Sequence, residues 1–301
     1  MILRETAIEA TKHPKVMNSL QEALKCIEEE GNQTLVLDNY GGQGLIYKLN
    51  SDKYPFPILI KIPFYSRHPS EAIAEHGILK EARIAEVLTK SGEDLSPKLL
   101  AFHEEGRYLI REYALGEELA EHLKKCDEPE RDQLLLQVFE LVKKLFHLFH
   151  DYPEQSYTIR DLKPRNMIYT TEGKLYMIDC GSCRPESNMV SRDREKAIKR
   201  FGCGKYLHWP IEQLIEDPEL CDRRVDYFSW GVLAYYTLFL ERPYTNDTAD
   251  LEIAKAEYDR RYRIACERLE KACALGRLSE QLKENIVWSL HPDARQRRFI
   301  V

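Results

Sequence analysis

The 301-residue sequence lacks the features that mark several large classes of protein. No apolar run reaches the roughly 18 residues that a membrane-spanning helix requires. Residues 1–15 have neither the basic nor the apolar region of a secretory signal peptide. The net charge is −6 and no block of lysines and arginines occurs, so we expect neither a nucleic acid nor a membrane surface as a partner.

The sequence also lacks a disulfide pattern, an internal repeat and a low-complexity linker. Its 8 cysteines are few for a chain of this length, and no export signal accompanies them. Cys180 and Cys183 have metal-ligand spacing, but a single pair supplies only half of a zinc site. We therefore expect mostly free thiols and a reducing, cytoplasmic location.

The elements that the sequence does contain predict an α+β fold of two lobes. The first 30 or so residues have helical periodicity and end at Gly31. A strand-rich part follows, which contains one predicted helix at residues 69–92. A mainly helical part continues to the end. The expected division is an N-terminal helical extension (1–34), a small β-rich N-lobe (35–115) and a larger, mainly helical C-lobe (116–301).

A glycine-rich turn and a lysine within an apolar strand are the first candidates for chemistry. Gly41, Gly42 and Gly44 lie between two predicted strands, where a glycine backbone can approach phosphate oxygens, although a plain hairpin turn explains them equally. Lys61 lies inside the apolar run "ILIKIPF", 17 residues after Gly44. It either points to solvent or is buried, and a buried ammonium requires an anionic partner.

A glutamate on the following helix could be that partner. Glu81 shares its side of the helix with apolar residues and could reach inward to Lys61. A solvated position is the alternative, and Glu75 and Glu86 remain competitors for the same role.

The segment "IRDLKPRNMIY", residues 159–169, surrounds several charges with apolar flanks. Asn166 follows Asp161 by 5 positions, and Asp179 follows it by 18, at the end of a second short strand. An amide oxygen and a carboxylate suit Mg²⁺ when phosphates supply its remaining ligands. Asp161 could then accept a hydroxyl proton, and Lys163 could neutralise a moving phosphoryl group.

Taken in order, these motifs resemble the eukaryotic-type (Hanks-type) serine/threonine protein kinase family over about residues 35–298. The resemblance extends to "YLHWPIEQL", "DYFSWGVL" and "HPDARQRR" in the second half. It implies a two-lobed kinase fold, ATP and Mg²⁺ as cofactors, and a protein substrate. Lys163 within "RDLKPRN" is typical of the serine/threonine pattern.

The resemblance also implies a role for individual residues. Lys61 would bind the α- and β-phosphates and pair with Glu81, and Asp161 would be the catalytic base. The glycine loop over the phosphates would contain Asn39, Gly41 and Gly44. The hinge that binds adenine would be Glu112 to Ala114, and the Mg²⁺ ligands would be Asn166 and Asp179. In the helical lobe, Asp226 would hold the backbone of the catalytic loop, and Glu212 would pair with Arg295.

Several positions depart from the family pattern without removing a group that performs the chemistry. Cys180 replaces a phenylalanine, Leu59 replaces an alanine beside adenine, and Arg111 occupies the position that gates the pocket behind adenine. Arg111 could pair with Glu81 or with Asp179. We expect an active kinase that phosphorylates itself through self-association. A nucleotide-binding pseudokinase scaffold and a kinase of a small molecule or glycolipid are the alternatives.

Overall fold

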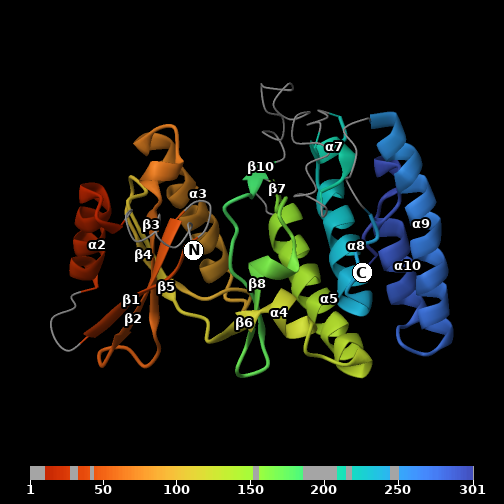
Figure 1. The fold of residues 1–301 in the computed structure, drawn as a ribbon, viewed down its shortest axis with the longest axis horizontal. Coiled ribbons are helices and arrows are strands. Elements are labelled where there is room, and N and C mark those ends of the chain that lie inside the picture. The colour runs from red at the N-terminus through yellow and green to blue at the C-terminus, as the bar shows by residue number, and fades with distance from the viewer. Residues whose placement is uncertain are drawn as a thin grey trace. The chain divides into compact units, whose positions relative to one another are not determined.

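The computed structural model describes residues 11–27, 33–40, 44–151, 156–185, 209–214, 219–244 and 251–300 (Figure 1). The predicted glycines Gly41 and Gly42 lie outside these ranges, as does most of the segment between Asp179 and Glu212. The chain forms two compact units, which are described separately. The first comprises residues 1–115 and 176–181, and the second comprises residues 116–175 and 182–301.

The first unit is built on a five-stranded antiparallel sheet with the order β1-β2-β3-β5-β4. Its strands and helices, with one short 3₁₀ turn, are α2 (Pro14–Cys26), β1 (Gln33–Tyr40), β2 (Gly44–Ser51), β3 (Ile58–Pro63), η1 (Tyr65–Arg67), α3 (Glu71–Lys90), β4 (Leu99–Phe102) and β5 (Leu109–Glu112). Ser70 caps α3 by accepting a hydrogen bond from the Ile73 amide at 3.3 Å. Pro14 at the start of α2 has no amide hydrogen to leave unpaired.

The two faces of this sheet are packed differently because strand residues alternate between them. Ile58, Ile60 and Ile62 of β3 belong to one buried cluster with Val16 and Leu20 of α2. Leu59 of β3 and Leu109 of β5 belong to a second cluster, with Ile78, Ala82 and Ala85 of α3. Lys61 has the same strand parity as Leu59, so it lies on the face that carries α3.

The second unit is mainly helical. Its elements are β6 (Gly116–Glu118), α4 (Leu119–Leu123), α5 (Glu128–His150), β7 (Tyr157–Thr158), η2 (Pro164–Asn166), β8 (Met167–Thr170), β10 (Arg184–Pro185), α7 (Ile211–Leu214), α8 (Arg224–Phe239), α9 (Leu251–Ala274), α10 (Glu280–Ser289) and η4 (Ala294–Gln296). Strand β9 (Leu175–Met177) begins in this unit and continues into the first. α8 is apolar on most sides and almost wholly buried, which makes it the central helix of this unit.

These observations confirm the predicted α+β fold, with one sheet-rich part and one helical part (Figure 1). Within the stretch predicted to be helical, helix α2 spans Pro14–Cys26, and residues 1–10 and 28–32 lie outside the described ranges. Within the described ranges, no helix combines the length and hydrophobicity needed to cross a membrane. The seven cysteines in those ranges are free thiols, as predicted.

Candidate active site

Lys61 of β3 and Glu81 of α3 form a buried ion pair in the first unit. The distance from Lys61 Nζ to Glu81 Oε2 is 2.5 Å, and the side chains are 7% and 2% exposed. Strand parity directs Lys61 toward α3, and Glu81 shares the buried side of that helix with Ile78, Ala82 and Ala85. The pairing predicted from the sequence is therefore present, and Lys61 does not point to solvent.

The environment of this pair changes the pKa of both groups. Burial lowers the pKa of Lys61, but the Glu81 and Asp179 carboxylates outweigh it, and the pKa is raised overall. Burial also raises the pKa of Glu81, against the opposing effect of the Lys61 ammonium. Glu81 Oε1 is buried and has no hydrogen-bond partner in the described parts of the chain. The pair therefore retains an unsatisfied oxygen that could accept a hydrogen bond from a ligand.

Arg111 of β5 lies on the same side of the sheet as this pair and is 6% exposed. Its Nη1 donates to the backbone carbonyl of Ile178 at 2.6 Å. The sequence left open whether Arg111 pairs with Glu81 or with Asp179, and the structure shows a carbonyl partner instead. Asp179 follows Ile178, and its Oδ1 accepts a hydrogen bond from the Gly181 amide at 3.0 Å. Arg111 thus fixes the backbone beside Asp179 and leaves the Asp179 carboxylate available.

The predicted hinge and glycine positions also lie in the first unit. Glu112 ends β5, its amide donates to the carbonyl of Lys98 at 2.9 Å, and Ala114 follows two residues later. Asn39 is near the end of β1, opposite Ile46, beside an irregularity in the strand pairing. A Cβ atom added to Gly44 would lie 3.0 Å from Lys61 Cε and from the Ile62 carbonyl oxygen. Gly44 therefore leaves room for the Lys61 side chain.

The second unit carries the segment that contains Asp161. Lys163 Nζ lies 2.7 Å from Asp161 Oδ2 and 3.0 Å from Oδ1. Asn166 Nδ2 donates to the backbone carbonyl and to Oδ2 of Asp161, at 2.9 Å in each case. Pro164 begins the short η2 turn that brings Asn166 back to Asp161. The structure thus gathers three of the predicted residues around one carboxylate.

The backbone before Asp161 is held by a buried carboxylate. Asp226, at the start of α8, accepts the Ile159 amide at 2.8 Å and the Arg160 amide at 2.7 Å. Arg160 has φ of 67°, in the left-handed region that a non-glycine residue rarely adopts. Gln213 Nε2 donates to the Arg160 carbonyl at 2.9 Å. The predicted role of Asp226 is confirmed, and these contacts stabilise a strained turn directly before Asp161.

Sequence reasoning missed two residues of this anchor, Gln213 and His150. His150 is 3% exposed, and its Nε2 lies 2.9 Å from Asp226 Oδ2. It also stacks on Phe146, with ring centroids 4.5 Å apart. The helical spacing of the two residues, i and i+4, places His150 on the apolar face of α5 and could have indicated a buried histidine in need of a partner.

One predicted ion pair is wrong. Glu212 contacts Nη1 of Arg297, not Arg295, and the two side chains are 7% and 1% exposed. Arg297 also donates from Nε to the His291 carbonyl at 2.7 Å and from Nη2 to the Pro292 carbonyl at 3.1 Å. Arg295 lies within η4 and is exposed. The two-residue error arises because the turn at Ala294–Gln296 reverses which arginine faces the interior.

Asn166 in the second unit and Asp179 in the first unit each keep an oxygen atom that could bind a cation. Both hydrogens of the Asn166 amide nitrogen are directed to Asp161, which leaves the carbonyl oxygen as its ligand atom. Only Oδ1 of Asp179 is engaged by the Gly181 amide, which leaves Oδ2 for a cation. A carboxylate and an amide oxygen are the hard donors that Mg²⁺ prefers.

The sequence is similar to a protein family and to several known kinases. Residues 41–300 match the family model described as the protein kinase domain. Aurora kinase A-B of Xenopus laevis is 27% identical over 213 residues, which are 69% of this chain and 47% of that protein. The tyrosine-protein kinase MasK of Myxococcus xanthus is 28% identical over 165 residues, which are 52% of this chain and 24% of that protein.

Serine/threonine-protein kinase MRCK gamma of Mus musculus is 30% identical over 145 residues, which are 47% of this chain and 9% of that protein. The chain thus spans about half the length of the Aurora relatives and less of the others. The family model, in contrast, covers most of the sequence, including the residues around Lys61 and Asp161. This chain therefore belongs to the protein kinase domain family.

Proposed function

We propose that this chain is an ATP- and Mg²⁺-dependent serine/threonine protein kinase that transfers the γ-phosphoryl group to protein hydroxyls, and that it phosphorylates itself. The observation that carries the proposal is the environment of Asp161. Its carboxylate is 2.7 Å from the Lys163 ammonium and 2.9 Å from the Asn166 amide, on a turn fixed by Asp226. A positioned carboxylate beside a lysine ammonium suits proton removal from a hydroxyl during phosphoryl transfer.

In this proposal each group has one task. Asp161 orients the acceptor hydroxyl and receives its proton, and Lys163 neutralises negative charge on the transferring group. Lys61 contacts the α- and β-phosphates and is kept in place by Glu81, which lies 2.5 Å away. Asp161 thus acts on the acceptor hydroxyl, Lys163 on the transferring phosphoryl group, and Lys61 on the α- and β-phosphates of the donor.

The proposed cofactor ligands are assigned in the same way. Asn166 and Asp179 bind Mg²⁺, which supplies positive charge to the phosphates when it is bound. The adenine is bound by backbone groups of Glu112 and Ala114, and the phosphates by the glycine turn. The turn consists of Asn39, Gly41, Gly42 and Gly44.

Serine and threonine are proposed as acceptors because Lys163 stands two residues after Asp161, as in the serine/threonine pattern. Two similar proteins, MRCK gamma and a probable kinase of Dictyostelium discoideum, are named serine/threonine-protein kinases, whereas MasK is named a tyrosine-protein kinase. The identity of the labelled amino acid therefore belongs in the test.

A nucleotide-binding scaffold without transfer activity is the second candidate. The observation that favours it is Arg111, which is buried and whose positive charge acts to lower the pKa of Lys61. An extra cation near the phosphate-binding lysine could change how a nucleotide is bound.

Transfer of labelled phosphate from ATP with Mg²⁺ distinguishes these candidates. Purified wild type and Asp161→Asn are assayed alone, with a generic basic protein and with a generic acidic protein, and labelled residues are identified after hydrolysis. We expect label on serine or threonine with the wild type and no label with Asp161→Asn. Equal label with the wild type and with Asp161→Asn would contradict the assignment of Asp161. Binding of ATP in a thermal-shift assay without label would support the scaffold.

A further inference from the structure

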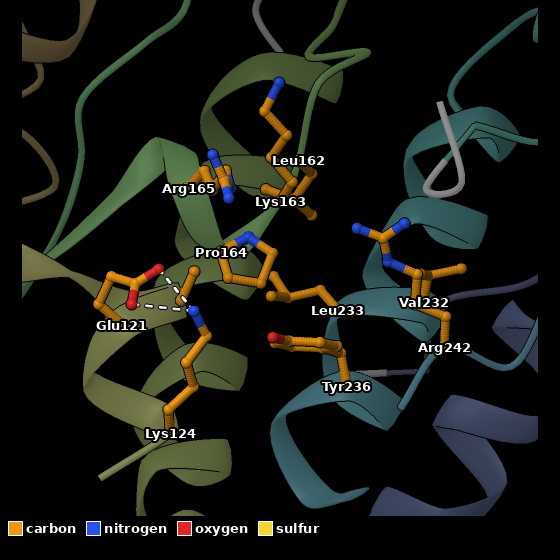
Figure 2. A pocket seen from close by; sticks show the side chains of 11 residues that line it. Glu121, Lys124, Leu162, Lys163, Pro164, Arg165, Val232, Leu233, Tyr236 and Arg242 are labelled. Atoms are coloured by element: carbon orange, nitrogen blue, oxygen red, sulfur yellow. Dashed lines mark hydrogen bonds and ion pairs between the residues drawn. The ribbon is translucent and has the colours of Figure 1, made fainter. Parts of the chain in front are cut away.

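A pocket in the second unit lies beside the proposed chemistry and shares only Lys163 with it. It lies between α4, the turn after Asp161 and the C-terminal half of α8, and has a cavity volume of about 360 Å³ (Figure 2). Every residue that lines it belongs to the second unit. The pocket is therefore defined within a single compact unit.

The charge of this pocket is strongly unbalanced. Its lining contains one carboxylate, Glu121, and four cations: Lys124, Lys163, Arg165 and Arg242. Lys124 neutralises Glu121 through contacts of 2.7 and 2.9 Å (Figure 2). Lys163 is paired with Asp161. Among the residues that the structure describes, the carboxylates paired with this lining, Glu121 and Asp161, thus account for two of the four positive charges.

Arg165 and Arg242 are the two uncompensated cations. Both are exposed, and neither forms an ion pair or a side-chain hydrogen bond with any residue that the structure describes. Figure 2 shows Arg242 on the side of the pocket opposite to Glu121 and Lys124. A group that enters the pocket therefore meets two guanidinium groups that no side chain of the described ranges engages by an ion pair or hydrogen bond.

The floor of the pocket is apolar. Leu162, Val232 and Leu233 line it and are 0%, 4% and 1% exposed. Apolar walls reduce the local dielectric constant, so the attraction between a guanidinium group and an anion is stronger than in open water. Arginine also binds carboxylate and phosphate oxygens in a bidentate manner. The pocket thus favours an anionic group and disfavours a cation.

The pocket begins one side chain away from the proposed catalytic carboxylate. Lys163 lines the pocket, and its ammonium lies 2.7 Å from Asp161 Oδ2. A peptide whose hydroxyl reaches Asp161 could extend a neighbouring side chain past Lys163 toward Arg165. The same cations would repel a basic side chain at that place, which gives selectivity in addition to affinity.

We propose that this pocket binds an anionic side chain of the protein substrate, a carboxylate or a phosphorylated residue, close to the acceptor hydroxyl. The proposal rests on the proposed kinase function and adds a substrate class to it. Arg165 and Arg242 provide the recognition, and the apolar floor strengthens it.

The test uses serine peptides that differ only beside the acceptor, with glutamate, glutamine, lysine or phosphoserine at the flanking positions. We expect the glutamate peptide to have a kcat/KM about tenfold higher than the glutamine peptide, and the lysine peptide to be the poorest substrate. The phosphoserine arm distinguishes the two sources of the anion. The advantage of the acidic peptides should decrease as salt is added.

Arg165→Gln/Arg242→Gln is the informative variant, because it removes both uncompensated charges without changing Asp161 or Lys163. It should lower kcat/KM for the glutamate peptide to the value for the glutamine peptide and leave the latter almost unchanged. Arg295→Gln removes an exposed cation elsewhere in the same unit and serves as the matched control.

Peptide binding, measured by fluorescence polarisation without ATP, separates this proposal from the proposed function. If no peptide or protein is phosphorylated but acidic peptides bind preferentially and the double variant loses that preference, the kinase assignment fails and the anion pocket stands. If the wild type phosphorylates peptides without preferring acidic ones, the kinase assignment stands and the pocket proposal is overturned. Equal binding of the glutamate and glutamine peptides would also overturn it.

Discussion

The two units each contain a buried ion pair, and the pairs differ in how completely their polar atoms are satisfied. Arg297 contacts Glu212, donates to two backbone carbonyls and places its guanidinium 4.6 Å from the ring of Phe228. Within the described ranges, the Lys61 ammonium donates a hydrogen bond to Glu81 Oε2, and Glu81 Oε1 has no hydrogen-bond partner. The polar atoms of the Arg297–Glu212 pair are thus engaged within the protein. The Lys61–Glu81 pair retains a polar atom that a ligand could use.

The difference teaches that burial alone does not separate a structural charge from a functional one. Both pairs are almost fully buried, with exposures of 7% and 2% for Lys61 and Glu81 and of 1% and 7% for Arg297 and Glu212. A saturated pair loses hydrogen bonds if it binds anything else, while an unsaturated one gains them. The predictions below test this distinction, from the largest expected effect to the smallest.

Removing Arg297 should have the largest effect on stability. Arg297→Met leaves Glu212 buried without its partner and two carbonyls without donors, so we expect a loss of about 4–5 kcal/mol in the free energy of unfolding. Urea unfolding followed by circular dichroism measures it. Arg295→Met, a change at the exposed arginine two residues earlier, should cost less than about 0.5 kcal/mol. Similar losses in the two variants would contradict the pairing.

Lys61→Met should abolish phosphoryl transfer and destabilise the protein less, by about 3 kcal/mol. The penalty is smaller because burial already raises the pKa of Glu81, which can therefore become neutral by binding a proton. A raised carboxyl pKa means that the folded state binds the proton more tightly than the unfolded chain does. The deficit of the variant should consequently shrink as the pH falls from 7 toward 5, as measured by unfolding at each pH.

The double variant Lys61→Met/Glu81→Leu provides the control for this effect. It replaces both charges by apolar groups of similar volume, so most of the lost stability should return while transfer activity stays absent. A double variant no more stable than Lys61→Met would show that the loss does not come from an unpaired Glu81.

The contrast between the two pairs also explains what could be predicted from the sequence. Lys61 lies in a regular strand and Glu81 in a regular helix, so periodicity indicated that both could face inward, while Glu75 and Glu86 remained competitors. Arg297 follows a short 3₁₀ turn in a segment where arginines stand at positions 295, 297 and 298. No period exists there to decide which of them faces inward, and the choice of Arg295 was wrong.

The anchor of the Asp161 segment shows the same limit. Asp226 was predicted from the family resemblance of the segment "DYFSWGVL", but His150 and Gln213 come from elements far away in the sequence. Their partners are fixed by tertiary packing, which local patterns do not encode. The imbalance of charge around Arg165 and Arg242 likewise becomes visible only when α4, the turn at Pro164 and α8 are brought together (Figure 2).

Asp226→Asn tests whether a buried carboxylate that accepts backbone amides contributes to stability as Glu212 does. Asparagine keeps one acceptor but loses the charge that receives the Ile159 and Arg160 amides, so we expect a loss of about 2 kcal/mol in stability. The strained turn before Asp161 should relax, and kcat should fall about tenfold. Asp222→Asn, the same change at a partly exposed residue that pairs with Arg224, should reduce stability by less than 1 kcal/mol and leave kcat unchanged. Unfolding and transfer assays on the two variants decide between local anchoring and a general effect of charge.

The smallest effect on stability is expected at Gly44, which lies directly against the unsaturated pair. Gly44→Ala places a methyl group 3.0 Å from Lys61 Cε and from the Ile62 carbonyl, so either Lys61 or the strand must shift by a few tenths of an ångström. We expect about 1 kcal/mol of destabilisation and a several-fold higher KM for ATP. Gly77→Ala is the matched control, because a methyl group there meets nothing within 4 Å and the residue lies within α3. That variant should gain up to about 1 kcal/mol through its higher helix propensity, with KM unchanged. A KM for ATP that rises equally in both variants would show that the Lys61–Glu81 pair is no more sensitive to its surroundings than the rest of the unit.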